Sequence, residues 1–171
     1  MNKGIALCLL LVFLTGCSSP VWETVDDADA DAVAVSGADA VYRIETSLPQ
    51  EMELLVQTDD WCVYSNADGT MEVETRTFPA SDVAAAVKML SGYDSEHLNV
   101  LQTERFGLPE YQFAWVSQTE CGQRLHRADI VIDGTDCYAV ICSTLEQVGN
   151  AYADEVRQVI AAFGLYTDEG V

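Results

Sequence analysis

The chain has 171 residues, of which 28 are acidic and only 8 are basic, so its formal net charge is −20. Charge of this sign is repelled by phosphate backbones and by anionic lipid headgroups, which argues against nucleic-acid binding and against membrane docking through a basic patch. The length fits one domain with accessory segments, and a hydrophobic content of 49% is too high for a disordered chain.

The N-terminus has the three-part form of a secretory signal. Lys3 precedes ten apolar residues, from Ile5 to Leu14, and small residues follow. A helix needs about 20 residues to span a bilayer, so this apolar run is too short for a stable transmembrane anchor. The sequence therefore predicts a signal peptide over residues 1–16.

The end of this signal, Leu14-Thr15-Gly16-Cys17, resembles the lipobox of bacterial lipoproteins. The resemblance implies cleavage between Gly16 and Cys17, and a Cys17 that carries an S-diacylglycerol and an N-acyl group. Stable anchoring needs more than one acyl chain, and this modification supplies it. The alternative is an ordinary secretory signal in which Cys17 occurs by chance. We expect a bacterial lipoprotein, held by lipid on the extracytoplasmic face of a membrane.

Residues 17–40 form a different segment, in which six acidic residues and no basic ones follow the cysteine. Its apolar residues follow neither a helical nor a strand period, so we expect the segment to be a disordered tether that is extended by repulsion between its charges. Alternate aspartates starting at Asp27 have the spacing with which an EF-hand calcium loop begins. The sixth and twelfth positions of that loop need Gly and Glu but hold Ala32 and Ala38, so we interpret the aspartates as solvated linker charge.

Regular patterns then continue from residue 41 to residue 166, which we expect to form one domain with a tail at residues 167–171. Apolar and polar side chains that alternate between turn-forming residues predict strands. The predicted strands cover residues 41–47, 54–57, 61–64, 71–78, 98–104, 111–117, 125–132 and 137–142. Helical spacing of apolar residues predicts helices over residues 81–90 and 146–163, which end at Gly92 and Gly164.

The last three predicted strands form a meander with two apolar faces. Tight turns would place Tyr111, Phe113 and Trp115 on one face with Ile132, Ile130 and Ala128, and Ala114, Val116, Val131, Tyr138 and Val140 on the other. Both faces of such a sheet have to be covered, and the two helices can do this. The sequence thus predicts an α+β fold in which an antiparallel sheet of six or seven strands lies between two helices.

This order of elements resembles the PsbP-like fold, which includes lipoproteins of the LpqN type. The resemblance is carried by residues 42–49, the Asp68-Gly69 hairpin, the helix at 81–90, the strands around Phe113-Ala114-Trp115 and Tyr138-Ala139-Val140, and the C-terminal residues 159–163. It implies an α/β/α sandwich and a non-catalytic binding or assembly module of the cell envelope. It carries over no functional residue, and it implies no cofactor.

Four cysteines remain in the domain, namely Cys62, Cys121, Cys137 and Cys142. An extracytoplasmic compartment permits disulfides, and four cysteines allow three pairings among which the sequence does not choose. Cys137 and Cys142 are five residues apart on one strand, so their side chains point to opposite faces and do not bridge easily. A zinc site would need closely spaced Cys or His pairs, which this sequence lacks.

The remaining candidate chemistry is sparse. Cys121 with His126 is the least implausible catalytic pair of a hydrolase, and a Ser–His pair is the alternative, although no nucleophile motif supports either. Carboxylates near turns, at Asp59-Asp60, Glu72/Glu74 and Asp133/Asp136, could instead bind cations such as calcium. Trp61, Tyr64, Tyr93 and Trp115 could line a ligand cleft, but aromatic residues at alternating positions are more often core. We therefore expect a lipid-anchored, non-catalytic module that binds an envelope protein or a small ligand, with a cation-binding lipoprotein as the alternative.

Overall fold

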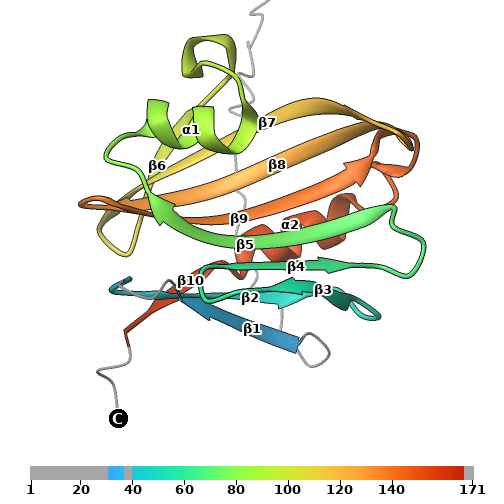
Figure 1. Cartoon of the computed structure of the whole chain (residues 1–171), viewed down its shortest axis with the longest axis horizontal. Coiled ribbons are helices and arrows are strands. Elements are labelled where there is room, and N and C mark those ends of the chain that lie inside the picture. The colour runs from blue at the N-terminus through green and yellow to red at the C-terminus, as the bar shows by residue number, and fades with distance from the viewer. Residues whose placement is uncertain (1–30, 37–39, 168–171) are drawn as a thin grey trace, which may run out of the picture.

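A seven-stranded antiparallel sheet forms the centre of the computed structural model, which describes residues 31–36 and 40–167 (Figure 1). Its strands are β3 (Glu53–Gln57), β4 (Trp61–Ser65), β5 (Met71–Pro79), β6 (Leu101–Arg105), β7 (Leu108–Thr119), β8 (Gly122–Asp133) and β9 (Asp136–Leu145). They lie in the order β3-β4-β5-β9-β8-β7-β6. The predicted meander is confirmed, since β7, β8 and β9 are joined by two-residue turns that pair Phe113 with Ala128 and Ile132 with Cys137.

A second sheet of three strands lies against one face of the first. It contains β1 (Asp31–Ser36), β2 (Arg43–Leu48) and β10 (Gly164–Tyr166), in the order β1-β2-β10. The tether predicted for residues 17–40 is therefore wrong over β1, which pairs along its whole length with β2. The alanines of β1 give a weak strand signal, and its pairing depends on a partner strand seven residues farther along the chain.

Two helices cover the two faces of the large sheet, as the sequence predicts. The first, α1 (Val83–Ser91), begins where the Asp82 side chain accepts a hydrogen bond from the Ala85 amide, and it ends at Gly92 in the left-handed conformation. The second, α2 (Ala153–Ala161), is shorter than the predicted helix at 146–163. Gly149 and Asn150 interrupt that segment, because both residues have low helix propensity. Neither helix of the described residues is long and apolar enough to cross a membrane.

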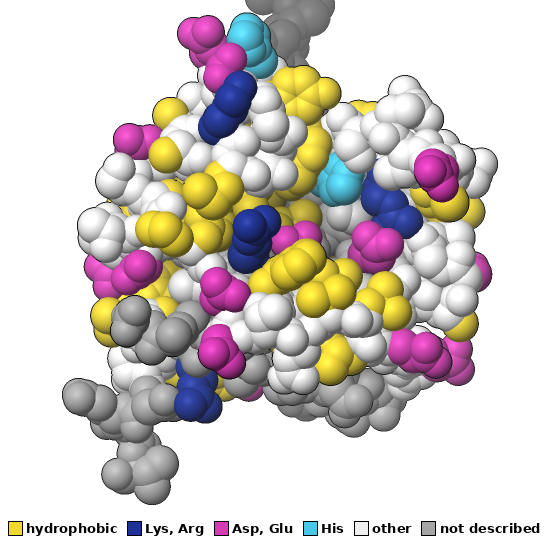
Figure 2. Space-filling view, viewed as in Figure 1, with side chains coloured by type: hydrophobic (Ala, Val, Ile, Leu, Met, Phe, Trp, Pro, Cys, Tyr) yellow, Lys and Arg dark blue, Asp and Glu magenta, His cyan; other side chains and the backbone are white. Residues whose placement is uncertain are grey.

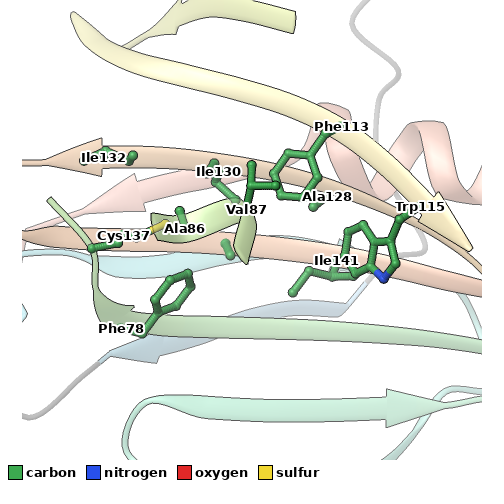
Figure 3. Packing of buried hydrophobic residues seen from close by; sticks show 12 residues of the cluster. Phe78, Ala86, Val87, Phe113, Trp115, Ala128, Ile130, Ile132, Cys137 and Ile141 are labelled. Carbon is green, nitrogen blue, oxygen red and sulfur yellow. The ribbon is translucent and has the colours of Figure 1, made fainter. Parts of the chain in front are cut away.

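Each face of the sheet has its own hydrophobic core. Figure 3 shows the first, in which Ala86 and Val87 of α1 pack on side chains of the sheet that include Phe113, Trp115 and Ile130. The second core joins the opposite face to α2 and β2. Its buried members are Ile44, Leu48, Met71, Val73, Val131, Tyr138, Val140, Cys142, Val159 and Phe163. Each helix thus covers one apolar face of the sheet, as predicted, and the fold is the predicted α+β sandwich.

The four cysteines of the domain are free thiols that the fold keeps apart. Cys137 and Cys142 lie on β9 and face different cores, as predicted. Cys62 is buried on β4, and Cys121 is exposed in the turn between β7 and β8. Burial raises the pKa of the Cys142 thiol to about 12, so this group is inert at physiological pH. Cys17, the lipobox, the tether at 17–30 and 37–39, and the tail at 168–171 lie outside the described residues.

Candidate functional site

Helix α1 has only nine residues and leaves part of the sheet beneath it uncovered. We call this uncovered part the open face. Charged, polar and aromatic side chains of five strands share it, namely Trp61, Glu72, Glu74, Arg76, Ser117, Arg124, His126 and Ser143, of which Arg124 and Ser143 are buried. Figure 2 views the molecule from this side and shows basic, acidic and histidine side chains among hydrophobic ones. The open face is where polar groups from distant parts of the sequence come together.

His126 is held by one hydrogen bond at each ring nitrogen. Nε2 lies 2.7 Å from the Ser117 hydroxyl, and Nδ1 lies 2.7 Å from the Ser143 hydroxyl. The ring also stacks on Trp115, with 4.8 Å between centroids and 7° between planes. Burial, with a smaller contribution from Arg124, lowers the pKa of His126 to about 4. The imidazole is therefore neutral at physiological pH, and one nitrogen donates while the other accepts.

The charges of the open face are paired across strands. Arg124 donates a hydrogen bond of 2.6 Å to the Gly69 carbonyl and lies 3.0 Å from Glu72. This arginine is only 8% exposed, so its ion pair is shielded from water. The guanidinium thus ties β8 to the turn between β4 and β5 and fixes the position of Glu72.

A second ion pair, more exposed, lies at the centre of the open face. The guanidinium of Arg76 lies 5.9 Å from the Trp61 ring centroid and 3.9 Å from Glu74. Burial raises the pKa of Glu74, and the charge of Arg76 opposes this shift. An exposed arginine next to an indole and a carboxylate can contact an aromatic ring, a carboxylate or an amide of a bound partner.

The structure does not assemble the Cys121–His126 pair, although it places the hydroxyls of Ser117 and Ser143 on His126. Both ring nitrogens of His126 bond to serines, so Cys121 has no histidine as a base and that prediction is wrong. His97 is exposed in the 3-10 turn Ser95–His97, next to Asp94 and Glu96. Among the described residues, no group of three or more His, Cys, Asp or Glu side chains could hold a metal ion.

No sequence pattern marks Ser117 and Ser143 as neighbours of His126. They are 9 and 17 residues from it in the sequence, and only strand register brings the three together. A serine in a strand carries no signal by itself. A loop at Asp133-Gly134 would set His126 opposite Ile141, and only the observed loop at Gly134-Thr135 sets it opposite Ser143.

A second polar cluster, also unexpected, is buried on the opposite face of the sheet. Arg105 lies 2.5 Å from Glu110 and 3.3 Å from Asp129, and it donates a hydrogen bond of 2.8 Å to the Phe163 carbonyl at the end of α2. Gln112 donates a hydrogen bond of 3.0 Å to Asp129. We call Arg105, Glu110, Gln112 and Asp129 the buried carboxyl cluster.

The two carboxyl groups of this cluster differ in protonation. Burial, followed by the charge of Glu110, raises the pKa of Asp129 to about 8. Burial opposes the ionisation of Glu110 as well, but hydrogen bonds from Thr103 and Arg105 outweigh it and lower the pKa of that group. A neutral Asp129 that donates a hydrogen bond to an ionised Glu110 accounts for both shifts. The cluster therefore links β6, β7 and β8 to α2 and serves the fold rather than a reaction.

Comparison with known proteins identifies the fold. No family model matches the chain, and no curated protein matches it in sequence. Among solved structures, the cyanobacterial PsbP protein CyanoP from Synechocystis sp. PCC 6803 is similar at a TM-score of 0.56 and 11% identity, over 86% of this chain and 100% of that one. LpqN, a protein involved in cell envelope biogenesis of Mycobacterium tuberculosis, is similar at a TM-score of 0.50 and 12% identity, over 88% of this chain and 99% of that one. The chain thus has the PsbP-like fold that its sequence predicts.

Proposed function

We propose that this protein is a lipid-anchored binding module on the extracytoplasmic face of a bacterial membrane, and that its open face binds an envelope protein without catalysing a reaction. The observation that carries the proposal is the open face itself. A nine-residue helix leaves part of the sheet uncovered, where partly buried arginine, carboxylate and aromatic side chains position one another through ion pairs and ring contacts. Such preorganised mixed surfaces are typical of protein interfaces.

The state of His126 supports binding rather than catalysis. A general base has to accept a proton near physiological pH, and a pKa of about 4 makes this imidazole a weak base. Both of its nitrogens already have hydroxyl partners, which hold the ring parallel to Trp115. We interpret His126 as a part of the surface that fixes the positions of its neighbours.

The anchor rests on the lipobox and is tested separately from the open face. Changing Cys17→Ala removes the thiol that receives the diacylglycerol, and we expect an unprocessed precursor without lipid label. Metabolic labelling with a radioactive fatty acid, followed by membrane fractionation, measures this. Normal processing of the Cys17→Ala chain would refute the anchor and leave the binding proposal standing.

Binding by the open face is tested with a matched pair of charge reversals. Arg76 is half-exposed on the open face, and Arg127 is exposed on the opposite face of the same sheet. If a partner binds the open face, Arg76→Glu should lower recovery of that partner by about tenfold or more, which corresponds to about 1.4 kcal/mol. Arg127→Glu should leave recovery unchanged. The measurement is quantitative co-purification after cross-linking in intact cells, and equal recovery with both variants would contradict the proposal.

A further inference from the structure

The strand β7 has 12 residues and its outer neighbour β6 has only 5, so part of one sheet edge is open. β6 begins opposite Gln112 of β7, because Leu98 and Val100 before it pack against the first core. Residues 113–119 of β7 therefore have β8 on one side and, among the described residues, no strand on the other. We call residues 113–119 the free edge.

The free edge directs unpaired backbone groups away from β8. In an antiparallel pair, successive residues point their backbone groups alternately toward the partner strand and away from it. The Val116 carbonyl accepts a hydrogen bond of 3.2 Å from the Tyr93 hydroxyl, so Val116 faces away from β8. The same alternation turns Gln112 toward β6, with which it pairs, and turns Ala114 and Gln118 outward. Within the part of the chain that the structure describes, the Val116 amide and both backbone groups of Ala114 and Gln118 have no partner on this side.

The free edge lacks the features that usually keep sheet edges from pairing with another chain. Those features are charged residues, prolines and bulges. Residues 111–119 contain no charged residue and no proline, and their register with β8 runs without a bulge. Val116 and its cross-strand partner Leu125 are each 43% exposed and add apolar surface beside the edge. In a chain of net charge −20, such an uncharged and regular edge favours the addition of a strand.

We propose that the free edge binds an extended segment of the partner protein, which adds a strand beside β7. The backbone of this segment pairs with Ala114, Val116 and Gln118, and it replaces the Tyr93 hydroxyl at the Val116 carbonyl. Residues 41–171 contain 22 acidic and 7 basic residues, so the field of the domain favours a segment with apolar residues in its middle and basic residues at its ends. A second copy of the chain would bring the same negative charge and is disfavoured.

This inference rests on the proposed function and deepens it, because it states how the partner docks. Ser117 belongs to the free edge, and its hydroxyl contacts His126 on the open face, so an added strand continues the open face beyond β7. Arg127 lies on β8, two strand spacings or about 10 Å from the added strand, and it remains outside the contact.

The test is a titration of the full chain, labelled with ¹⁵N and kept in neutral detergent. The probe is the peptide acetyl-Lys-Val-Thr-Val-Thr-Val-Lys-amide, N-methylated at its three valines. Methylation of alternate residues blocks one edge of the peptide, which prevents it from stacking on itself, and leaves the other edge to pair with β7. We expect saturable shifts of the amide signals of Ala114, Val116 and Gln118. A peptide that is also N-methylated at both threonines keeps the charge but has no central amide to pair, and it should bind at least tenfold more weakly.

Variants locate the peptide on β7. The change Val116→Pro removes an outward amide, which an edge strand tolerates, and it should weaken binding of the probe at least tenfold. The matched control is Gln102→Pro, at an outward position of β6, which should leave the affinity unchanged. The two peptides act on the wild-type chain, so they decide the question even if Val116→Pro does not fold.

The co-purification assay separates this inference from the proposed function. If the partner is lost with Arg76→Glu but fully recovered with a folded Val116→Pro chain, the proposed function stands and strand pairing is overturned. Saturable binding at β7 with a partner that survives Arg76→Glu would support the free edge and contradict the open face. Strand pairing is also overturned if both peptides bind equally, if the shifts appear at β6 and not at β7, or if concentrating the chain without peptide shifts the same amides, which would indicate a second copy.

Discussion

The buried carboxyl cluster predicts an unusual pH dependence of stability, which the change Asp129→Asn isolates. Asp129 is fully buried, and its pKa in the folded chain is about 8, against an ordinary value of 3.8. Asparagine has the shape of the neutral acid. Its amide oxygen can accept the hydrogen bonds of Gln112 and Arg105, and its amide nitrogen can donate to Glu110 as the acid proton does.

The expected magnitude follows from proton linkage. A group whose folded pKa is raised gives stability that is complete below its unfolded pKa and is lost as the pH rises toward the folded pKa. Between those values the unfolded chain has released the proton of Asp129 and the folded chain retains it, so the free energy of unfolding falls by about 1.4 kcal/mol per pH unit. From pH 5 to pH 7, the Asp129→Asn chain should therefore gain roughly 3 kcal/mol of stability relative to the wild type.

The assay is urea unfolding followed by tryptophan fluorescence, at several pH values from 5 to 7, with the full chain. The lowered pKa of Glu110 acts below its ordinary value of 4.5, outside this window. His126 is present in both proteins, so its contribution to the pH dependence of the free energy of unfolding cancels in the difference between them. The exposed Asp59→Asn serves as the control, and its difference from the wild type should not change with pH. The reasoning is refuted if the difference for Asp129→Asn stays constant, or if the wild type becomes the more stable chain as the pH rises.

Three other predictions follow from single residues. Phe106 is 68% exposed in the two-residue turn between β6 and β7, and its φ of 55° is a strained conformation for a bulky residue. Asparagine adopts this conformation more easily, so Phe106→Asn should raise the free energy of unfolding in urea by about 0.5–1 kcal/mol. A lower free energy of unfolding would contradict the strain. Ile130 is fully buried under α1, so Ile130→Ala should lower the free energy of unfolding by about 2–5 kcal/mol. A decrease below about 1 kcal/mol would contradict the packing. Cys121 is exposed and the other three domain cysteines are buried, so Cys121 alone among them should react rapidly with a disulfide reagent in the folded chain. Mass spectrometry measures the labelling rate of each cysteine. Equal rates for Cys62, Cys137 or Cys142 would contradict their burial.

Local signals were enough to predict most of this fold. The Asp133-Gly134 signal predicts the turn between β8 and β9 to within one residue, since Asp133 pairs with Asp136 and the loop is Gly134-Thr135. Helical spacing places Ala86 and Val87 on the buried side of α1. Each of the eight predicted strands corresponds to an observed one. The sequence did not predict the second sheet, because β1 is a short segment between acidic and small residues and β10 has only three residues. Such segments form strands only because β2 offers a partner for their backbone groups.

The polar sites were harder to predict because they depend on tertiary contacts. Charged residues in strands are usually interpreted as solvent-exposed, so Arg105, Glu110 and Asp129 gave no hint of a buried cluster. One signal was present, since Asp129 is two residues from Val131 and so falls on an apolar face of the sheet. A carboxyl group on such a face needs a partner or a proton. The open face had no local signal, because its extent depends on how short α1 is.

Photo-cross-linking in intact cells tests the central claim, that the open face is the binding surface, most directly. A photoreactive amino acid is placed at Val63, which is half-buried beside Glu74 on the open face, and for comparison at Arg127 on the opposite face. The account predicts a discrete cross-linked envelope protein from position 63, lost when Arg76→Glu is added, and none from position 127. Equal cross-linking from both positions, or cross-linking from position 127 alone, would contradict it.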